Sequence, residues 1–395
     1  MMNKKILVIN AGSSSIKFRV YNYEDLNELG SGLCERIFVD GHIKVKTAQG
    51  KELEKDAAMP DHTAAVQIAL DALKELKIIE DLNDIAGIGH RIAMGGQFFK
   101  ESTRVDDEKI LNKAIEYGKI APLHNPCETT VIKVFKKLVP NAFNVGVFDT
   151  SYHSTIPAVN SDYCLDRETT RKYEIKKYGF HGTSYRYIAK KMEEVLGKKN
   201  PNLIVCHIGN GASICAIKEG KSYDTTMGLS PLQGLIMGTR CGDIDASVCT
   251  YLLTQGLTGD QVNAELNKKA GMLGLAGSSD SRDVIAKANA GDANAKLARE
   301  IQLQRIANYV IQYANELGKV DAIVFTAGCG ENDPLLLEGV CDRVKLMNLK
   351  YDANKNKQKY GDYLEVTASG SDTRIFRVRT NEELMIAGDV KALAK

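Results

Sequence analysis

The sequence predicts an α/β fold in which two halves of the chain begin with the same pattern. Residues 6–9 are apolar, a polar loop containing Gly12 follows at 10–15, and apolar residues alternate with polar ones over 16–20. This order is typical of a buried strand, a turn and a half-buried strand. It returns at 203–217. Because domains usually span about 100–200 residues, the repeat predicts two domains with a boundary near residue 150.

Helices are expected between these strands. The segments 63–76, 184–196 and 295–317 carry apolar residues at spacings of three and four, which is the pattern of an amphipathic helix. Residues 322–325 predict a further buried strand, and a glycine turn is expected after it at 326–332. Strands that alternate with helices indicate the α/β class.

Composition excludes several classes of protein. The 395 residues are 44% hydrophobic and 26% charged, and the net charge of +2 gives no bias of the whole chain toward nucleic acid or anionic membrane. The nine cysteines include no C-x-x-C pair, which argues against a zinc ribbon or a disulfide framework. Apolar runs are too short for a signal peptide or a membrane span. We therefore expect a soluble cytoplasmic protein that binds neither nucleic acid nor a membrane.

Three glycine-containing turns follow predicted strands, at 10–15, 207–212 and 326–332. Glycine lets the backbone approach an anion closely, and exposed N–H groups complement phosphate. One such turn often only reverses the chain, but three at strand ends favour phosphate binding. Neither the P-loop motif nor the dinucleotide-binding motif is present at these turns, so another type of nucleotide site is expected.

Charged residues between small neighbours form a second group of candidates. Arg91, Arg240 and Arg282 lie in such segments, which suits a guanidinium group that binds carboxylate or phosphate, although an arginine taken singly more often forms an ordinary ion pair. Asp149 follows the apolar strand 145–148 and suits either the positioning of a metal or a nucleophile, or a helix cap. His181 could act on a substrate or pack in the core.

These groups together match the demands of phosphoryl transfer, which needs oxygens to be positioned and neutralised. The seven histidines show no zinc-binding spacing. Mg²⁺ remains open, because it needs only one or two protein oxygens beside phosphate and water.

Eight motifs in order along the chain resemble the acetokinase family, that is, the acetate kinases. They are VINAGSSSIK (8–17), HRxxxGG (90–96), FDT (148–150), YGFHGTS (178–184), HIGNGAS (207–213), MGTRCGDID (237–245), TAGCGEN (326–332) and TNEELMIA (380–387). The resemblance implies the fold of the acetate and sugar kinases, actin and the heat-shock ATPases, with two duplicated ribonuclease H-like domains and an active-site cleft between them. It implies an N-terminal domain at 1–150, to which about 384–395 return, a nucleotide-binding domain at 151–383, and a homodimer.

The implied reaction converts ATP and acetate into ADP and acetyl phosphate, reversibly and with Mg²⁺ or Mn²⁺. The resemblance assigns the metal to Asn10 and Glu382. It assigns the substrate carboxylate to Arg91, an essential acidic role to Asp149, and stabilisation of the transferring phosphoryl group to His181 and Arg240. The substrate pocket is assigned to Arg91, Ala93, Leu123 and Pro231. ATP is assigned to Lys17, His207, Ile208, Gly209, Asn210, Gly211, Asp280, Ser281, Arg282, Gly328, Cys329, Gly330, Glu331 and Asn332.

Three positions depart from the family pattern. Ala93 stands where valine is common, and the smaller side chain could admit a longer acid; a propionate kinase is therefore the close alternative. Ser281 stands where phenylalanine is common, in a motif one residue short, which bears on the adenine contact. Arg379 replaces a proline without a clear consequence. A nucleotide-switched binding module of the actin type is a further alternative, which Arg91 and Arg240 argue against.

Overall fold

The computed structural model describes residues 4–122 and 124–394. Its chain divides into two compact units. Unit 1 comprises Met1–Tyr152 and Asn381–Lys395, and unit 2 comprises His153–Thr380.

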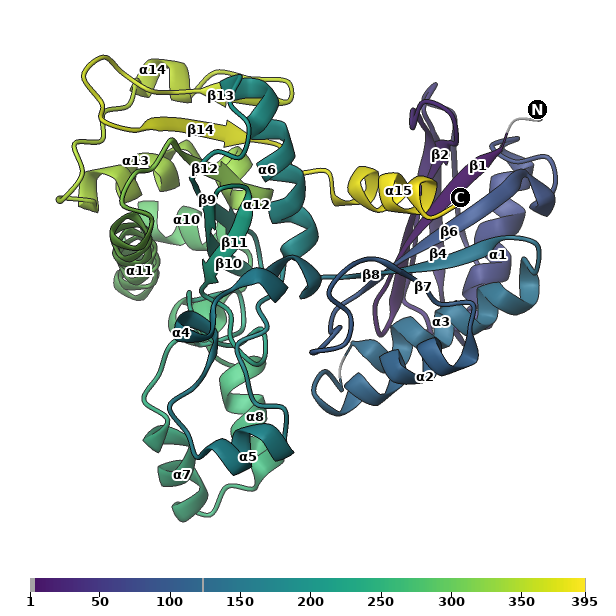
Figure 1. Cartoon of the computed structure of the whole chain (residues 1–395), viewed down its shortest axis with the longest axis horizontal. Helices are drawn as coiled ribbons and strands as arrows, with labels where there is room; N and C mark the ends of the chain where they lie inside the picture. The colour runs from purple at the N-terminus through teal and green to yellow at the C-terminus, as the bar shows by residue number, and fades with distance from the viewer. Residues whose placement is uncertain (1–3, 123, 395) are drawn as a thin grey trace. The chain divides into compact units, whose positions relative to one another are not determined.

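Among the described residues of unit 1, eight strands form one sheet in the order β5-β4-β3-β2-β1-β6-β8-β7 (Figure 1). Their bounds are β1 Lys5–Ala11, β2 Ser15–Asn22, β3 Glu28–Glu35, β4 His42–Thr47, β5 Glu52–Asp56, β6 Ile85–Ile92, β7 Thr103–Arg104 and β8 Phe143–Phe148. The predicted hairpin is confirmed, since β1 and β2 pair antiparallel across the turn that holds Gly12.

Parallel pairing places three predicted site residues at one edge of this sheet. β1 pairs parallel with β6, and β6 pairs parallel with β8. The carboxyl ends of these strands therefore meet. Asn10 is near the end of β1, Arg91 is near the end of β6, and Asp149 follows β8 directly.

Helices cover both faces of the unit 1 sheet. Their bounds are α1 His62–Glu75, α2 Glu108–Glu116, α3 Asn125–Leu138 and α15 Glu382–Ala392, with short 3₁₀ turns at Leu82–Asp84, Tyr117–Lys119 and Ser151–Thr155. The alternation of β1 sets the two faces: Leu7 and Ile9 share a core with residues of α1 and α3, whereas Ile6 and Val8 share one with residues of α15. A Cβ on Gly89 would lie 2.4 Å from Ile386 Cγ2, so glycine lets α15 approach β6 closely.

In unit 2, six strands of the described chain form a sheet in the order β11-β10-β9-β12-β14-β13. Their bounds are β9 Leu203–Ile208, β10 Ala212–Lys218, β11 Lys221–Thr225, β12 Ala322–Thr326, β13 Tyr363–Glu365 and β14 Arg374–Val378. The second predicted hairpin is confirmed by the antiparallel pairing of β9 and β10. β12 then pairs parallel with both β9 and β14.

The same five-strand core is therefore present twice. In each unit an antiparallel series of three strands continues into two parallel strands, as β3-β2-β1-β6-β8 and as β11-β10-β9-β12-β14. This is the duplicated α/β fold that the repeat and the family resemblance predict.

The helices of unit 2 are α4 Ala158–Ser161, α5 Arg167–Lys172, α6 Gly182–Leu196, α7 Ser247–Thr254, α8 Gly259–Asn267, α9 Gly271–Ala276, α10 Ser281–Asn289, α11 Ala293–Leu317, α12 Ala327–Asn332, α13 Pro334–Arg343 and α14 Ala353–Asn356. The three predicted helices are confirmed as α1, α6 and α11, each beginning one or two residues earlier than expected. The predicted glycine turn at 326–332 is wrong, because this segment forms the short helix α12.

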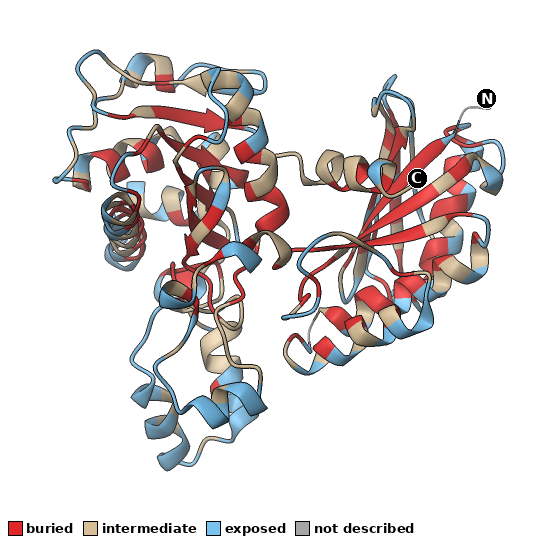
Figure 2. Cartoon of the chain, in the orientation of Figure 1, coloured by how far each residue is buried: buried red, intermediate tan, exposed pale blue. Residues whose placement is uncertain are grey.

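Burial separates two parts of unit 2. The strands of its sheet are largely buried, whereas α5, α7 and α8 carry many exposed residues (Figure 2). Within residues 4–122 and 124–394, no helix combines the length and apolar character that a membrane crossing requires.

Candidate active site

Arg91 is the centre of a charged cluster in unit 1. Its Nε and Nη2 donate to the two carboxylate oxygens of Asp149, at 3.2 and 2.5 Å, and its Nη1 donates to Asn10 Oδ1 at 3.3 Å. Asp149 is 1% exposed. Asp149 is thus a bidentate partner of the arginine rather than a helix cap. Three of the five guanidinium N–H groups are used in this way, which leaves two for a ligand.

The first turn of α15 brings further carboxylates to this cluster. Attraction by Asp149 is the largest cause that raises the pKa of Arg91, and Glu382 adds to it. Burial raises the pKa of Glu382 to about 7, against the attraction of Arg91. Asn10, Asp149 and Glu382 therefore offer an amide oxygen and carboxylates close to one arginine, which is the type of oxygen donor that Mg²⁺ prefers.

Lys17 lies on β2 and is half-exposed. Its Nζ is 2.7 Å from Glu383 Oε1, and Arg19 Nε is 3.7 Å from the same oxygen. The lysine assigned to ATP is therefore held by a carboxylate, which a phosphate would have to replace or join.

The residues assigned to the substrate pocket fall in different units. Ala93 follows β6 in unit 1 and is 4% exposed. Pro231 belongs to unit 2, where its carbonyl accepts a hydrogen bond from Arg240 Nη1 at 3.0 Å. Leu123 lies outside the described residues.

His181 and Arg240 converge beside Gly211 in unit 2. A Cβ on Gly211 would lie 3.5 Å from His181 Nε2 and 3.8 Å from Arg240 Nη1. Arg240 bonds to Pro231 O and Met237 Sδ, and no described carboxylate pairs with it. Burial lowers its pKa, but a guanidinium group stays charged. A partly buried cation that lacks a counter-charge is suited to bind an anion.

Neighbouring hydroxyls orient the imidazole of His181. Its Nδ1 lies 2.8 Å from Ser213 Oγ, which Tyr185 Oη also contacts, so Nε2 is the ring nitrogen near Gly211. The ring stacks on His207 with centroids 4.1 Å apart. His181 also has a left-handed backbone, with φ of 57°. For a residue with a Cβ this conformation costs on the order of 1 kcal/mol, and such strain often marks a functional site.

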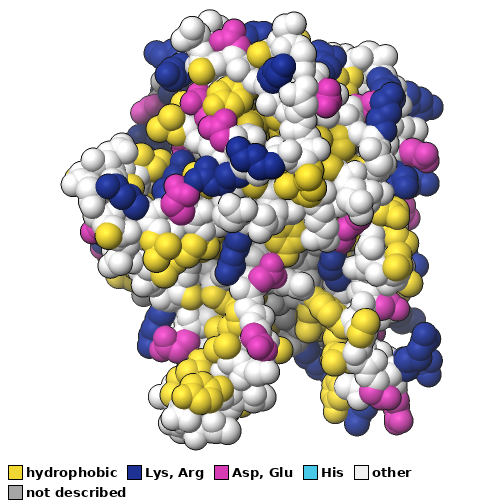
Figure 3. Space-filling view, turned by 90° about the vertical axis from the view of Figure 1, so that its left-hand side faces the viewer, with side chains coloured by type: hydrophobic (Ala, Val, Ile, Leu, Met, Phe, Trp, Pro, Cys, Tyr) yellow, Lys and Arg dark blue, Asp and Glu magenta, His cyan; other side chains and the backbone are white. Residues whose placement is uncertain are grey.

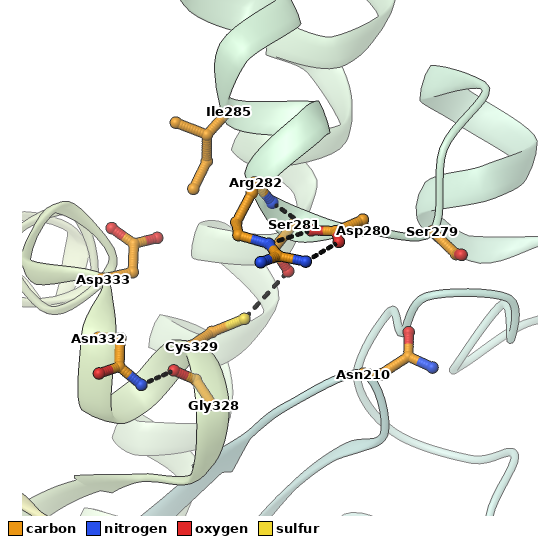
Figure 4. A pocket seen from close by; sticks show the side chains of 10 residues that line it. All are labelled: Asn210, Ser279, Asp280, Ser281, Arg282, Ile285, Gly328, Cys329, Asn332 and Asp333. Atoms are coloured by element: carbon orange, nitrogen blue, oxygen red, sulfur yellow. Dashed lines mark hydrogen bonds and ion pairs between the residues drawn. The ribbon is translucent and has the colours of Figure 1, made fainter. Parts of the chain in front are cut away.

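A pocket of about 710 Å³ includes in its lining Asn210, which precedes Gly211 in the chain (Figure 4). It is lined by Asn210, Ser279, Asp280, Ser281, Arg282, Ile285, Gly328, Cys329, Asn332 and Asp333. Arg282 forms a bidentate pair with Asp280, at 3.1 and 2.6 Å, and Ser281 Oγ is 3.0 Å from Cys329 Sγ. The pocket joins three segments that the resemblance assigns to ATP, from the β9–β10 turn, α10 and α12.

Glu331 does not line this pocket. Its Oε1 accepts hydrogen bonds from Ala327 N and Thr380 N, both at 3.0 Å. Its carbonyl accepts from Tyr360 Oη at 2.9 Å and from Arg377 Nη2. The residue anchors α12, from which Gly328, Cys329 and Asn332 line the pocket.

His207 and Ile208 also stand back from the pocket, in β9. His207 Nδ1 is bonded to Ser184 Oγ at 2.9 Å. The turn proper begins at Gly209, whose added Cβ would lie 4.0 Å from Gly328 N. The turn therefore reaches α12 directly.

Sequence reasoning missed Ile285, Asp333 and Glu128. Ile285 is one turn after Ser281 on α10, so the helix period could have indicated it. Asp333 caps α13 and accepts from Leu336 N, which is a recognisable N-cap pattern. Glu128 carries no local pattern that distinguishes it from a surface glutamate, yet it is 2% exposed.

Comparisons with known proteins agree with the motifs. The model of the Acetokinase family matches residues 5–388. An acetate kinase of Mycoplasmoides gallisepticum (strain R(low / passage 15 / clone 2)) is 47% identical over 395 residues, which cover 99% of this chain and 100% of the relative.

Solved structures give the same result. The crystal structure of Porphyromonas gingivalis acetate kinase has a TM-score of 0.93 and 36% identity, and covers 99% of this chain and 100% of its own. A propionate kinase from Francisella tularensis subsp. tularensis SCHU S4 also has a TM-score of 0.93 and 36% identity, with coverage of 98% and 99%. The chain therefore belongs to the acetokinase family.

Proposed function

We propose that the protein transfers the γ-phosphoryl group of ATP to the carboxylate of acetate, giving acetyl phosphate and ADP in a reversible reaction. The observation that carries the proposal is the convergence of His181 Nε2 and Arg240 Nη1 beside Gly211, next to the pocket that α10 and α12 line. Family membership supplies the reaction class, and these two side chains supply hydrogen-bond donors for the oxygens of the transferring group.

The proposed chemistry is direct. A carboxylate oxygen of acetate attacks the γ-phosphorus in line, the bond from phosphorus to the β–γ bridging oxygen breaks, and ADP leaves with the electron pair. Acetate is already ionised at neutral pH, so no residue has to remove a proton from it. Arg240 and His181 neutralise the equatorial oxygens of the transferring group, and no phosphoenzyme is formed.

Arg91, Asp149 and Ala93, which are proposed to act on the acceptor, belong to unit 1. Arg91 orients the acetate carboxylate with the two N–H groups that Asp149 and Asn10 leave unused. Asp149 holds the guanidinium plane in place, and Ala93 limits the size of the acid. Unit 2 supplies the nucleotide contacts, from Gly209, Asn210 and Gly211, from Asp280 to Arg282, and from Gly328, Cys329 and Asn332, while Glu331 anchors α12.

We propose that Mg²⁺ accompanies ATP. Asn10 and Glu382 would hold it. Asp149 is bonded to Arg91, the arginine that also contacts Asn10 and attracts Glu382. Among the described residues no group of three or more His, Cys, Asp and Glu side chains is arranged as a complete metal site. Two protein oxygens suffice for Mg²⁺ when phosphate and water complete its shell. When bound, the ion neutralises the oxygens of the phosphate chain.

Propionate is the second candidate substrate. Ala93 is small and buried, and the pocket wall it forms could accept one more methylene. One methylene changes discrimination by about 1–3 kcal/mol, so the same enzyme can use both acids at different rates.

The reaction is proposed to take place in the cytoplasm, because ATP is its co-substrate.

The proposed assembly is a homodimer. Every residue of α7 is at least partly exposed, although Val248, Tyr251 and Leu253 are apolar or aromatic. In Figure 3 hydrophobic side chains lie at the surface in the lower part of the view, the level at which α5, α7 and α8 lie in Figure 1. An exposed apolar helix of this kind is typical of an interface.

Hydroxylamine trapping tests the proposal. The enzyme is incubated with ATP, Mg²⁺ and either acetate, propionate or no acid, and the acyl hydroxamate is measured. We expect acetyl hydroxamate, with propionyl hydroxamate formed more slowly. A faster reaction with propionate would show that propionate is the preferred substrate. ATP binding without any hydroxamate would favour the nucleotide-switched module.

A further inference from the structure

Three consecutive backbone N–H groups after β6 are each held by a buried side chain. Glu128 Oε2 accepts from Ala93 N, Asn125 Oδ1 accepts from Met94 N, and Thr150 Oγ1 accepts from Gly95 N, all at 3.0 Å. Two of these acceptors come from the first turn of α3, and the third follows Asp149. The segment 93–95 is thus fixed residue by residue.

Packing leaves this segment little freedom to move. Asn125 Nδ2 also donates to Met94 O at 2.8 Å, which closes a second bond to the same residue. A Cβ on Gly95 would lie 2.9 Å from both Phe148 Cβ and Phe99 Cβ. Of the three bonded residues, Ala93 is the one that the family resemblance assigns to the substrate pocket.

The anchor of Ala93 is chemically unlike the other two, because it is ionisable. Glu128 is 2% exposed and lies within electrostatic range of Arg91 and Asp149. A buried carboxyl is costly unless it forms strong bonds, and a bond from N–H to carboxylate is stronger than a neutral one. Burial raises the pKa of Glu128 to about 7, while Arg91 and the Ala93 N–H oppose that rise.

We propose that Glu128 is a positioning residue that fixes the backbone of Ala93 and so sets how closely the enzyme selects acetate over longer acids. The inference rests on the proposed function. Glu128 acts through Ala93 and does not touch the acid in this scheme. Removing the bond would leave a buried N–H without an acceptor, and the pocket wall would shift or loosen.

Two substitutions separate the effect of the length of the Glu128 side chain from the effect of its charge. Glu128→Gln keeps the length and an acceptor oxygen but removes the charge. Glu128→Asp keeps the charge but is shorter by one methylene and cannot reach Ala93 N in the present backbone. Thr130→Ala, at an exposed position on the same helix, is the matched control.

The measurement is the ratio of kcat/KM for acetate and propionate, together with KM for ATP. We expect Glu128→Asp to move the ratio about tenfold toward unity, which is the lower end of the effect of one methylene in a pocket, with KM for ATP unchanged. In Glu128→Gln and Thr130→Ala the ratio should stay within about twofold of the wild-type value. The Gln variant retains the bond to Ala93, and the Ala variant leaves the whole site unchanged. Hydrogen exchange of peptides covering 92–95 should be faster only in the Asp variant.

Other results would overturn the inference. A ratio that changes in the Gln variant but not in the Asp variant would assign the effect to charge, and two unchanged ratios would remove any role in selectivity. A parallel loss of kcat and of affinity for both substrates, with a lower unfolding temperature, would show a merely structural role. If the wild type forms no hydroxamate from any acid, the proposed function fails first, and this inference falls with it.

Discussion

Arg91 and Arg240 differ in what occupies their guanidinium groups. Arg91 is held by Asp149 and Asn10, so its direction is fixed before any ligand arrives. Arg240 bonds only neutral acceptors among the described residues, a carbonyl and a thioether. The first arrangement suits orientation of a substrate, and the second suits neutralisation of charge that develops during transfer.

Arg240→Ala and His181→Ala are expected to lower kcat by about 100-fold or more, the scale for the loss of one group that stabilises transition-state charge. The fold should persist, since Arg240 anchors no other side chain by an ion pair. Steady-state kinetics and circular dichroism check this, with exposed Arg36→Ala as the control. Near-normal turnover in both variants would refute the roles assigned to them.

His153 makes stability depend on pH. Burial lowers its pKa to about 4 from 6.5, and the ring is bonded to Ser222 Oγ and Phe180 O. The folded protein therefore resists protonation that the unfolded chain accepts, so stability is lost as pH falls from 6.5 toward 4. The loss from this residue is about 3 kcal/mol at full extent.

Denaturant unfolding at pH 7 and pH 4.5 measures this effect. In His153→Gln the difference in unfolding free energy between the two pH values should shrink by about 2 kcal/mol. An unchanged difference would mean that the pKa of His153 is the same in the folded and the unfolded protein, as for a solvent-exposed imidazole.

The residues of the site show what sequence can and cannot reveal. Arg91, Asp149 and Arg240 were indicated by their places at a strand end or between small residues, and the family resemblance assigned a role to His181. The bond between Arg91 and Asp149 joins positions 58 apart, and only the parallel register of β6 and β8 brings them together. Glu128 could not be predicted, since its burial results from packing of α3 on the sheet.

At the scale of elements, α12 is the main difference between expectation and structure. Gly328 and Gly330 predicted a turn, because glycine weakens helices. The helix nevertheless forms, and Glu331 bonds back to Ala327 N at its start. Ala327 has φ of 64°, an unusual backbone for alanine that this contact holds in place. Glu331 is also bonded to Thr380, Tyr360 and Arg377, and these tertiary contacts overcome the local propensity.

Glu331→Ala should disturb α12 and raise KM for ATP by about tenfold, the effect of about 1.4 kcal/mol. The reason is that Ala327 N and Thr380 N lose their shared acceptor. KM for acetate should change little. Glu331→Gln, which keeps one acceptor oxygen, should be milder. The exposed Lys345→Ala serves as the control. A rise in KM for acetate instead of ATP would contradict the assignment of α12 to the nucleotide.

At the scale of the whole molecule, the duplicated hairpin was readable from the sequence. Apolar runs at 6–9 and 203–206 each precede a glycine turn, and both became the central strand of a sheet. The short strand β7 and the many small helices of unit 2 could not be predicted, because they have too few residues to show a period.

Sedimentation velocity tests the proposed homodimer. The wild type should sediment as a dimer of the 43.3 kDa chain, and Val248→Glu or Tyr251→Glu on exposed α7 should shift it toward monomer. The reason is that a charge placed in an apolar interface must be desolvated. Glu168→Gln, which lies on the exposed helix α5 and not on α7, provides a control. A wild-type monomer, or a dimer unaffected by both variants, would place the interface elsewhere or remove it.

The stoichiometry of transfer tests the central claim most directly. The enzyme is given ATP, Mg²⁺, acetate and hydroxylamine, and both ADP and acetyl hydroxamate are counted over time. The account predicts one hydroxamate for each ADP, with no ADP formed when acetate is absent and little of either product in Arg240→Ala. ADP that accumulates without hydroxamate, or hydroxamate formation that is indifferent to acetate, would contradict it.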